Sequence, residues 1–254
     1  MPDRPVALVT GGRRGIGRAI ALALARTGFD LAIGDVAEEA HETLAALADL
    51  GARAAFFRSD IADLASHEAT LAAVVDRLGG LDCLVNNAGM GAVVRGDPLD
   101  LLPENFDRVM AVNLRGTMFL TQAVARWMLA HPAPGRVRSI VHVTSVSASH
   151  ATPERLDYCI SKAGLAMWSQ GLALRLAPEG IAVFDVRPGI IRSDMTAGVA
   201  GAYEAMIAGG LVPARRWGEG SDIGRVVAAL ARGDFAFATG SVIDVDGGLS
   251  IPRL

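Results

Sequence analysis

Short apolar runs alternate with longer amphipathic stretches along the whole chain, and this alternation restricts the possible folds more than any other feature. Apolar and β-branched runs predict strands at residues 6–10, 30–35, 52–59, 83–86, 139–144, 181–187 and 241–245. Helical periodicity predicts helices at residues 16–27, 37–50, 64–78, 103–130, 156–177 and 221–231. Strands that alternate with helices of this length form βαβ units. We therefore expect an α/β fold, a doubly wound parallel sheet of about seven strands with helices on both faces.

Two stretches, at residues 90–102 and 192–216, interrupt this regularity. Both leave the carboxyl ends of predicted strands, which is the edge where open α/β sheets bind ligands. The second stretch is rich in glycine and is expected to form a flexible substrate lid, although it could also be a long surface loop without a role. No linker or internal repeat divides the chain, so one dinucleotide-binding and catalytic domain, 1–254, is expected.

A glycine-rich turn joins the first predicted strand to the first predicted helix. Gly11, Gly15 and Gly17 allow a tight turn there and bring backbone amides close to a pyrophosphate, which the positive end of the helix favours. In this strand–turn–helix context the motif predicts nucleotide binding and a Rossmann-type sheet. No lysine follows the glycines, which argues against a phosphate-cleaving P-loop.

Two aspartates end the second and third predicted strands. Asp35 is placed to accept hydrogen bonds from the adenosine ribose hydroxyls, or else to cap the helix that follows. Asp60 could receive the adenine amino group or cap the next helix, and Ile61 could pack on the adenine face. A carboxylate at Asp35 would repel a 2′-phosphate, whereas a basic Arg14 would favour one. Because the Asp35 carboxylate would lie closest to the ribose hydroxyls and Arg14 can turn away into water, NAD is the expected cofactor and NADP the alternative.

The sole lysine of the chain is conspicuously placed. Of 24 basic residues, 23 are arginine and only Lys162 is lysine, and it lies four residues after Tyr158, one of two tyrosines. A compact ammonium cannot be replaced by a planar guanidinium. Residues four apart share a helical face, so Lys162 can supply positive charge to the Tyr158 hydroxyl. Lowering a tyrosine pKa from about 10 to about 7 requires about 4 kcal/mol of phenolate stabilisation.

Further motifs occur in a fixed order along the chain. They are the glycine turn, Asn86-Asn87-Ala88-Gly89, Ser145, Tyr158 to Lys162, Pro188-Gly189 with Ser193, and Asp246-Gly247-Gly248. Together they resemble the short-chain dehydrogenase/reductase family over essentially the whole chain. The resemblance implies hydride transfer between a nicotinamide and a ketone or secondary alcohol. It also implies cofactor contacts from Gly11, Arg13, Arg14, Gly15, Ile16, Gly17, Asp35, Asp60, Ile61, Asn87, Ala88, Gly89, Tyr158, Lys162, Pro188, Gly189, Ile191 and Ser193.

The resemblance implies a catalytic tetrad of Asn113, Ser145, Tyr158 and Lys162. Tyr158 would act as general acid or base, and Lys162 would also grip the nicotinamide ribose. Ser145 would hydrogen-bond the substrate oxygen; Ser147, on the same side of an extended chain, is a rival for that role. Asn113 would hold a helix distortion and a water on the proton path, but it could also be an ordinary exposed asparagine.

The segment between Ser147 and Tyr158 is expected to border the reacting carbon. His150, Glu154 and Arg155 could engage hydroxyls or a carboxylate there, or they could belong to a solvated loop. Reductases of carrier-protein substrates in the family tend to have a basic residue before the sixth strand, where this chain has Glu179. A small polar substrate such as a sugar, polyol or hydroxy acid is therefore expected, with 3-oxoacyl-(acyl-carrier-protein) reduction as the alternative and a non-catalytic nucleotide-sensing protein as the rival class.

Composition and missing patterns argue against other functions. The five histidines show no metal-ligand spacing, so no metal is expected. A net charge of −3 without a basic stripe argues against nucleic acid as a partner. No apolar run approaches the roughly 18 residues that span a bilayer, and no secretory signal is seen, so a cytoplasmic protein is expected. The helix at 156–177 is apolar on more than one face, and the family resemblance implies a homotetramer.

Overall fold

The computed structural model describes residues 4–198 and 200–253. Its central feature is a sheet of seven strands in the order β3-β2-β1-β4-β5-β6-β7, in which every neighbouring pair runs parallel. The strands are β1 (Val6–Thr10), β2 (Asp30–Asp35), β3 (Ala54–Arg58), β4 (Cys83–Asn86), β5 (Arg138–Val143), β6 (Ile181–Pro188) and β7 (Val242–Val245). The expected α/β fold with a doubly wound parallel sheet is confirmed.

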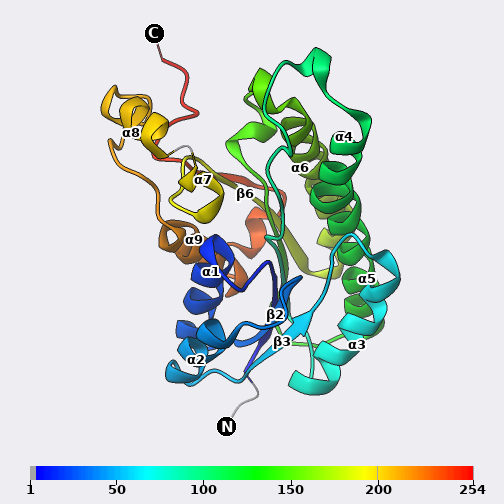
Figure 1. Cartoon of the computed structure of the whole chain (residues 1–254). Helices are drawn as coiled ribbons and strands as arrows, with labels where there is room; N and C mark the ends of the chain where they lie inside the picture. The colour runs from blue at the N-terminus through cyan, green and yellow to red at the C-terminus, as the bar shows by residue number, and fades with distance from the viewer. Residues whose placement is uncertain (1–3, 199, 254) are drawn as a thin grey trace.

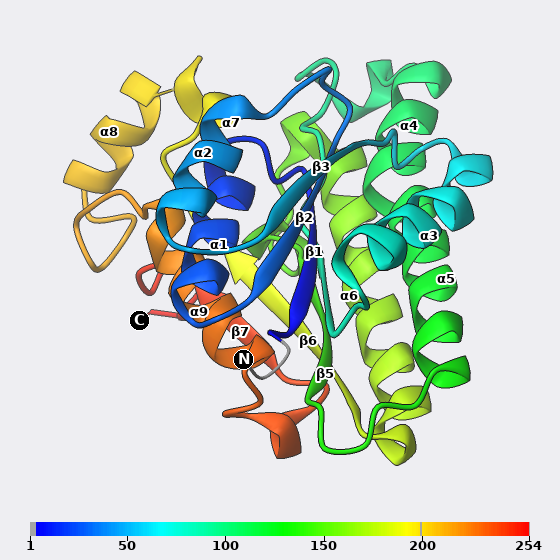
Figure 2. The ribbon, with the colours of Figure 1, turned by 90° about the horizontal axis from the view of Figure 1, so that it is seen from below.

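Helices form a layer on each face of the sheet (Figure 1). Seen from below, α1, α2 and α9 cover one face, and α3, α5 and α6 cover the other (Figure 2). The helices are α1 (Gly15–Arg26), α2 (His41–Asp49), α3 (His67–Leu78), α4 (Pro103–Met110), α5 (Thr117–Ala130), α6 (Leu156–Leu176), α7 (Asp194–Ala197), α8 (Ala200–Ala208) and α9 (Gly220–Ala231). Within the described ranges, every helix is too short or too polar to cross a bilayer.

The two faces of β1 explain why its sequence is apolar throughout. Ala7 and Val9 belong to the core beneath α1, α2 and α9, whereas Val6 and Leu8 belong to the core beneath α3, α5 and α6. All four side chains are at most 2% exposed. A parallel strand covered on both faces must be apolar at successive positions, not only at alternate ones.

The strand order reverses direction beside β1. The chain first builds outward from β1 through β2 to β3, and then returns to place β4 on the other side of β1. The carboxyl ends of β1 and β4 therefore open into a crevice between two diverging connections, which is where ligands bind in such sheets.

The stretch 103–130 is not one uniform α-helix. A π-helical turn, Ala111–Gly116, separates α4 from α5. A Cβ on Gly116 would lie 2.2 Å from the Ile61 carbonyl oxygen, so the chain passes very close to the end of the third strand there. Asn113, at the centre of the turn, is fully buried. The alternative of an exposed asparagine is therefore wrong, and the distortion implied by the family resemblance is present.

The stretch 192–216 is more ordered in secondary structure than the expected loop. It contains α7 and α8, and position 199 between them lies outside the described residues. Ile207, Val212 and Trp217 form a small buried cluster that packs against Tyr203. This segment thus has an apolar core of its own, which the count of glycines and loop formers did not reveal.

Candidate active site

A cavity of about 1420 Å³ lies at the carboxyl ends of the strands. Its wall combines the glycine-rich turn, the ends of β2 to β6, the start of α6 and the segment containing α7 and α8. Of the predicted site residues, those that line it are Gly11, Arg13, Arg14, Gly15, Ile16, Gly17, Asp35, Asp60, Ile61, Asn87, Ala88, Gly89, Ser145, Ser147, His150, Glu154, Arg155, Tyr158, Lys162, Pro188, Gly189, Ile191 and Ser193.

The glycine-rich turn is held against the end of β4. The Asn87 side-chain amide donates hydrogen bonds to the carbonyl oxygens of Thr10 and Gly11, at 3.0 and 3.1 Å. A Cβ on Gly17 would lie 2.1 Å from the Gly11 oxygen, which no side chain could tolerate. Gly15 has a φ of +55°, and a Cβ there would meet nothing within 4 Å. The backbone at Gly15 is thus open towards the cavity, as close approach of a pyrophosphate requires.

Asp35 marks the end of the cavity formed by β2. Its Oδ1 accepts a hydrogen bond from the Ala37 amide at 3.1 Å and lies 3.8 Å from the Arg13 Nε. The helix α2 begins only at His41, so the alternative that Asp35 caps it is wrong. The carboxylate terminates its strand in a local turn beside a cation, and it faces the same cavity as Gly15.

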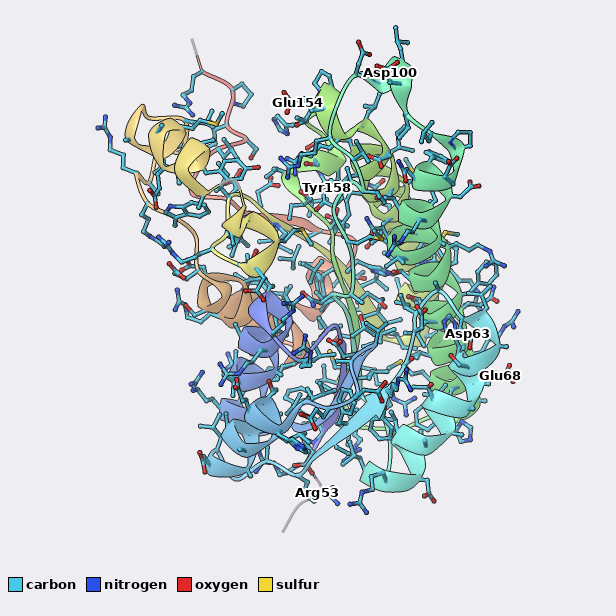
Figure 3. All side chains as sticks on the ribbon, in the orientation of Figure 1. Arg53, Asp63, Glu68, Asp100, Glu154 and Tyr158 are labelled. Carbon is cyan, nitrogen blue, oxygen red and sulfur yellow. The ribbon has the colours of Figure 1, made fainter. Side chains whose placement is uncertain are left out.

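Asp60 and Ile61 form the neighbouring wall. The Asp60 carboxylate accepts from the Ala62 amide at 2.9 Å, and Asp63, labelled in Figure 3, caps the following 3₁₀ turn instead. Asp60 therefore does not cap the next helix. Ile61 is buried in the core and lines the cavity.

Arg14 forms an ion pair at the surface of the protein. Its guanidinium pairs with the Asp194 carboxylate of α7 at 2.8 Å, and both side chains are largely exposed. The ion pair thereby connects the glycine-rich turn to the segment containing α7 and α8 across the mouth of the cavity.

Ser145 and Tyr158 are brought together although 13 residues separate them. Ser145 follows β5, Tyr158 lies in the first turn of α6, and the Ser145 hydroxyl is close enough to the phenol to lower its pKa. The Ser145 oxygen also accepts from the Ser147 amide at 3.0 Å. The Ser147 hydroxyl is itself buried and has no hydrogen-bond partner among the described residues. Both serines therefore lie in the cavity wall, and Ser145 is the one whose hydroxyl is near the Tyr158 phenol.

Lys162 lies one helical turn beyond Tyr158, and its ammonium donates to the Val143 carbonyl oxygen at 3.1 Å. Burial lowers the pKa of Lys162 to about 8, against the opposing charge of Asp185. Burial also raises the pKa of Tyr158, and the nearby Ser145 hydroxyl and the charge of Arg155 offset this only in part. The pKa of Tyr158 is thus raised and not lowered in the protein alone, because desolvation outweighs the effects of Ser145 and Arg155.

Asn113 does not line the cavity but lies behind it. Its side-chain oxygen accepts from the Met90 amide at 2.8 Å, and its nitrogen donates to the Met90 oxygen and to Ser161 Oγ. The Ser161 hydroxyl in turn donates to the Tyr158 carbonyl oxygen at 2.7 Å. Asn113 therefore connects the loop after β4 to the helical turn that carries Tyr158.

The chain after β6 forms the wall opposite α6. A Cβ on Gly189 would lie 2.6 Å from the Asp246 Cβ, so only glycine fits where the two segments cross. Ser193 begins α7 with a capping box shared with Thr196. Pro188, Gly189, Ile191 and Ser193 are thus together on this wall, as the motif predicted.

The predicted substrate residues lie at the end of the cavity around Tyr158. His150 and Glu154 are exposed, and the guanidinium carbon of Arg155 lies 5.4 Å from the centre of the Tyr158 ring. Glu154 and Tyr158 are labelled on the segment that begins α6 in Figure 3. Sequence reasoning missed further residues of the wall, Met90, Arg95, Arg108, Met195, Tyr203 and Met206. The sequence indicated these residues only in that they lie in or near the two irregular stretches, 90–102 and 192–216.

Comparison with known proteins decides the family. A family model described as enoyl-(acyl carrier protein) reductase matches residues 11–250. The chain belongs to the short-chain dehydrogenase/reductase family. This dehydrogenase/reductase is 36% identical to 3-oxoacyl-(acyl-carrier-protein) reductase of Haemophilus influenzae, over 96% of this chain and 97% of the relative. It is 32% identical to sorbitol dehydrogenase of Cereibacter sphaeroides, over 97% of each chain.

Solved structures agree with this assignment. A crystal structure of 3-oxoacyl-(acyl-carrier protein) reductase from Brucella melitensis in complex with NAD is 63% identical and covers 100% of both chains, with a TM-score of 0.98. The chain is therefore an NAD(P)-dependent oxidoreductase. It acts on a CH–OH/C=O pair, with NAD or NADP as its cofactor.

Proposed function

We propose that this dehydrogenase/reductase interconverts a ketone and a secondary alcohol of a small polar compound, and that Tyr158 transfers the proton. The observation that supports this most directly is that Ser145, Tyr158 and Lys162 lie together in the wall of a cavity that also contains the glycine-rich turn. Replacing Tyr158 with Phe and measuring carbonyl reduction tests the proposal.

In the proposed reaction each polar group has a distinct task. The bound nicotinamide supplies or accepts the hydride. The Ser145 hydroxyl orients the substrate oxygen, and the neutral Tyr158 hydroxyl donates the proton to that oxygen during reduction. Its raised pKa keeps Tyr158 protonated at neutral pH, which suits a proton donor. Lys162 supplies positive charge beside the ring and binds the nicotinamide ribose, while Asn113 positions the turn of α6 from behind.

We propose NAD(H) as the preferred cofactor. The cavity offers a glycine turn open at Gly15 for the pyrophosphate and the Asp35 carboxylate for the ribose hydroxyls. Asp60, Ile61, Asn87, Ala88 and Gly89 would complete the adenosine and ribose contacts, with the segment from Pro188 to Ser193 holding the nicotinamide side. The Brucella melitensis structure in complex with NAD supports the same choice.

The substrate class rests on the polar end of the cavity. His150, Glu154 and Arg155 bring polar and charged groups to the start of α6. Glu179 repels an acidic carrier protein less than its charge alone indicates, because Arg175 pairs with Glu179 at 3.0 Å and cancels that charge. The resemblance to 3-oxoacyl-(acyl-carrier-protein) reductases at up to 63% identity favours carrier-borne thioesters as the second candidate.

The two candidates are separated by comparing kcat/KM for an acetoacetyl group on carrier protein, the same group on a short thiol, and a panel of sugars, polyols and hydroxy acids. We expect the free polar compounds to be the better substrates. A strong advantage for the carrier-borne thioester would reject the polar class in favour of the second candidate.

We further propose a cytoplasmic homotetramer of single-domain subunits, 1–254, in which residues 192–216 close over the substrate. Leu165 and Leu176 of α6 face the core, but Met167 and Leu174 are 67% and 81% exposed. An α-helix with apolar side chains on its outer face is typical of a subunit interface. A monomer by light scattering at micromolar concentration would reject this assembly, and Leu174→Glu should weaken it.

A further inference from the structure

Five arginines line the cavity, and they fall into two groups by their ion pairs. At the end that we assign to the cofactor, Arg13 lies 3.8 Å from Asp35 and Arg14 pairs with Asp194 at 2.8 Å. The charges of these two arginines are therefore balanced by the protein itself.

The other three arginines have no such balance. Arg95, Arg108 and Arg155 make no ion pair with any described residue. Glu154 is the only carboxylate among the described residues that line this end of the cavity, so the wall there has an excess of positive charge.

The three arginines come from different segments that the fold brings together. The Gly96 amide, next to Arg95, donates to the Glu154 carbonyl oxygen at 3.1 Å, so the loop after β4 lies against the residues before α6. Arg108 belongs to α4, which packs against α6. The positive wall is therefore a product of the tertiary structure beside the start of α6.

Arg155 is the member closest to the chemistry. Its guanidinium carbon lies 5.4 Å from the centre of the Tyr158 ring, and the side chain is half-buried, whereas Arg95 and Arg108 are exposed. A guanidinium in this setting binds a carboxylate through two parallel hydrogen bonds. A neutral polyol would leave this half-buried charge without a counter-ion, which is unfavourable.

We propose that the substrate is a short oxo or hydroxy acid and that Arg155 binds its carboxylate, a few bonds from the reacting carbon. The proposal rests on the function proposed above and narrows it. Arg95 and Arg108, further out on the same wall, attract the anion towards the cavity. Arg155 is thus a specificity-determining residue, whereas Tyr158 acts on the carbonyl oxygen.

Calorimetric titration of the NAD-loaded enzyme tests this without turnover. The probes are malonate and its neutral isostere malonamide. We expect malonate to bind at least about tenfold more tightly, which corresponds to about 1.4 kcal/mol. Arg155→Gln should abolish this preference without weakening malonamide, and Arg155→Lys should keep part of it. Arg77→Gln, which removes one exposed arginine at the end of α3 outside the cavity wall, is the matched control and should behave as wild type.

Equal affinity for the two probes, binding of neither, or a preference that survives Arg155→Gln would overturn the proposal. The anion could instead be the phosphate of a thioester substrate. Comparing the affinities of acetoacetyl-pantetheine with and without its 4′-phosphate distinguishes this phosphate from a substrate carboxylate. A gain from the phosphate that depends on Arg95 and Arg108 but not on Arg155 would also overturn it. If malonate binds as expected but no carbonyl or alcohol is turned over, the binding proposal stands and the proposed oxidoreductase reaction on small polar compounds fails.

Discussion

Tyr158 and Lys162 lie one turn apart on α6, with the Lys162 ammonium 5.8 Å from the centre of the Tyr158 ring. The ammonium donates its hydrogen bond to the Val143 carbonyl oxygen of β5 and not to the phenol. The position of the Lys162 ammonium therefore depends on the strand behind it, and it lies beside the Tyr158 ring without contacting the hydroxyl.

Tyr158→Phe removes only the hydroxyl that transfers the proton. We expect kcat to fall by about 10² to 10⁴, the range for loss of a general acid, with the Kd for NAD(H) nearly unchanged. Steady-state reduction kinetics and cofactor titration measure the two quantities. Near-normal turnover of the Phe variant would show that another group transfers the proton.

Lys162→Arg should lower kcat at least about tenfold although the charge is retained. The larger, planar guanidinium cannot place one donor on the Val143 oxygen within a site where Lys162 is only 4% exposed. Arg18→Lys, the reverse exchange on α1, provides a control for the general effect of exchanging these residues. Activity close to wild type in Lys162→Arg would show that this position does not require a compact ammonium.

Asp35 should set the preference for NAD(H) over NADP(H). Unit charges about 4 Å apart repel by about 4 kcal/mol at an effective dielectric of 20, and Arg13 beside Asp35 reduces this. We expect Asp35→Ser to raise kcat/KM for NADP(H) about tenfold or more and to lower it for NAD(H). Both cofactors are compared in wild type, Asp35→Ser and Arg14→Gln. Wild type that favours NADP(H) would show that Arg14 dominates instead.

His142 of β5 should make the protein sensitive to acid. It is fully buried, and neither ring nitrogen has a hydrogen-bond partner among the described residues. Burial, with the charge of Lys162, lowers the pKa of His142 from 6.5 to about 3. The unfolded chain therefore binds more protons than the folded protein between these pH values. The contribution of neutral His142 to the free energy of unfolding is thus present above pH 6.5 and is lost as the pH falls towards 3.

The expected slope from His142 is at most about 1.4 kcal/mol per pH unit. His142→Leu should show a shallower fall in the free energy of unfolding over that window, measured by urea titration at several pH values. The exposed His41→Gln variant serves as the control. Identical slopes in wild type and His142→Leu would assign the acid sensitivity to other groups.

Local sequence determined much of the architecture and of the site. Periodicity predicted the central strands because strands buried on both faces must be apolar at every position, as β1 is. The spacing of four between Tyr158 and Lys162 predicted a shared helical face because the helical repeat is 3.6 residues. Gly15 and Gly17 predicted the turn because glycine readily adopts the positive φ found at Gly15, and because only glycine permits the close approach of Gly17 to the Gly11 oxygen.

Only the tertiary structure decided the remainder. No local rule reveals that Asn113 lies behind the loop at Met90, that Arg175 cancels the charge of Glu179, or that burial outweighs nearby cations at Tyr158. Likewise, Arg95 and Arg155 are 60 positions apart, and their proximity follows from the packing of two loops at one edge of the sheet. The desolvation of a residue and the charge around it depend on every segment that packs against it in the folded protein. A sequence motif contains only residues that are close along the chain.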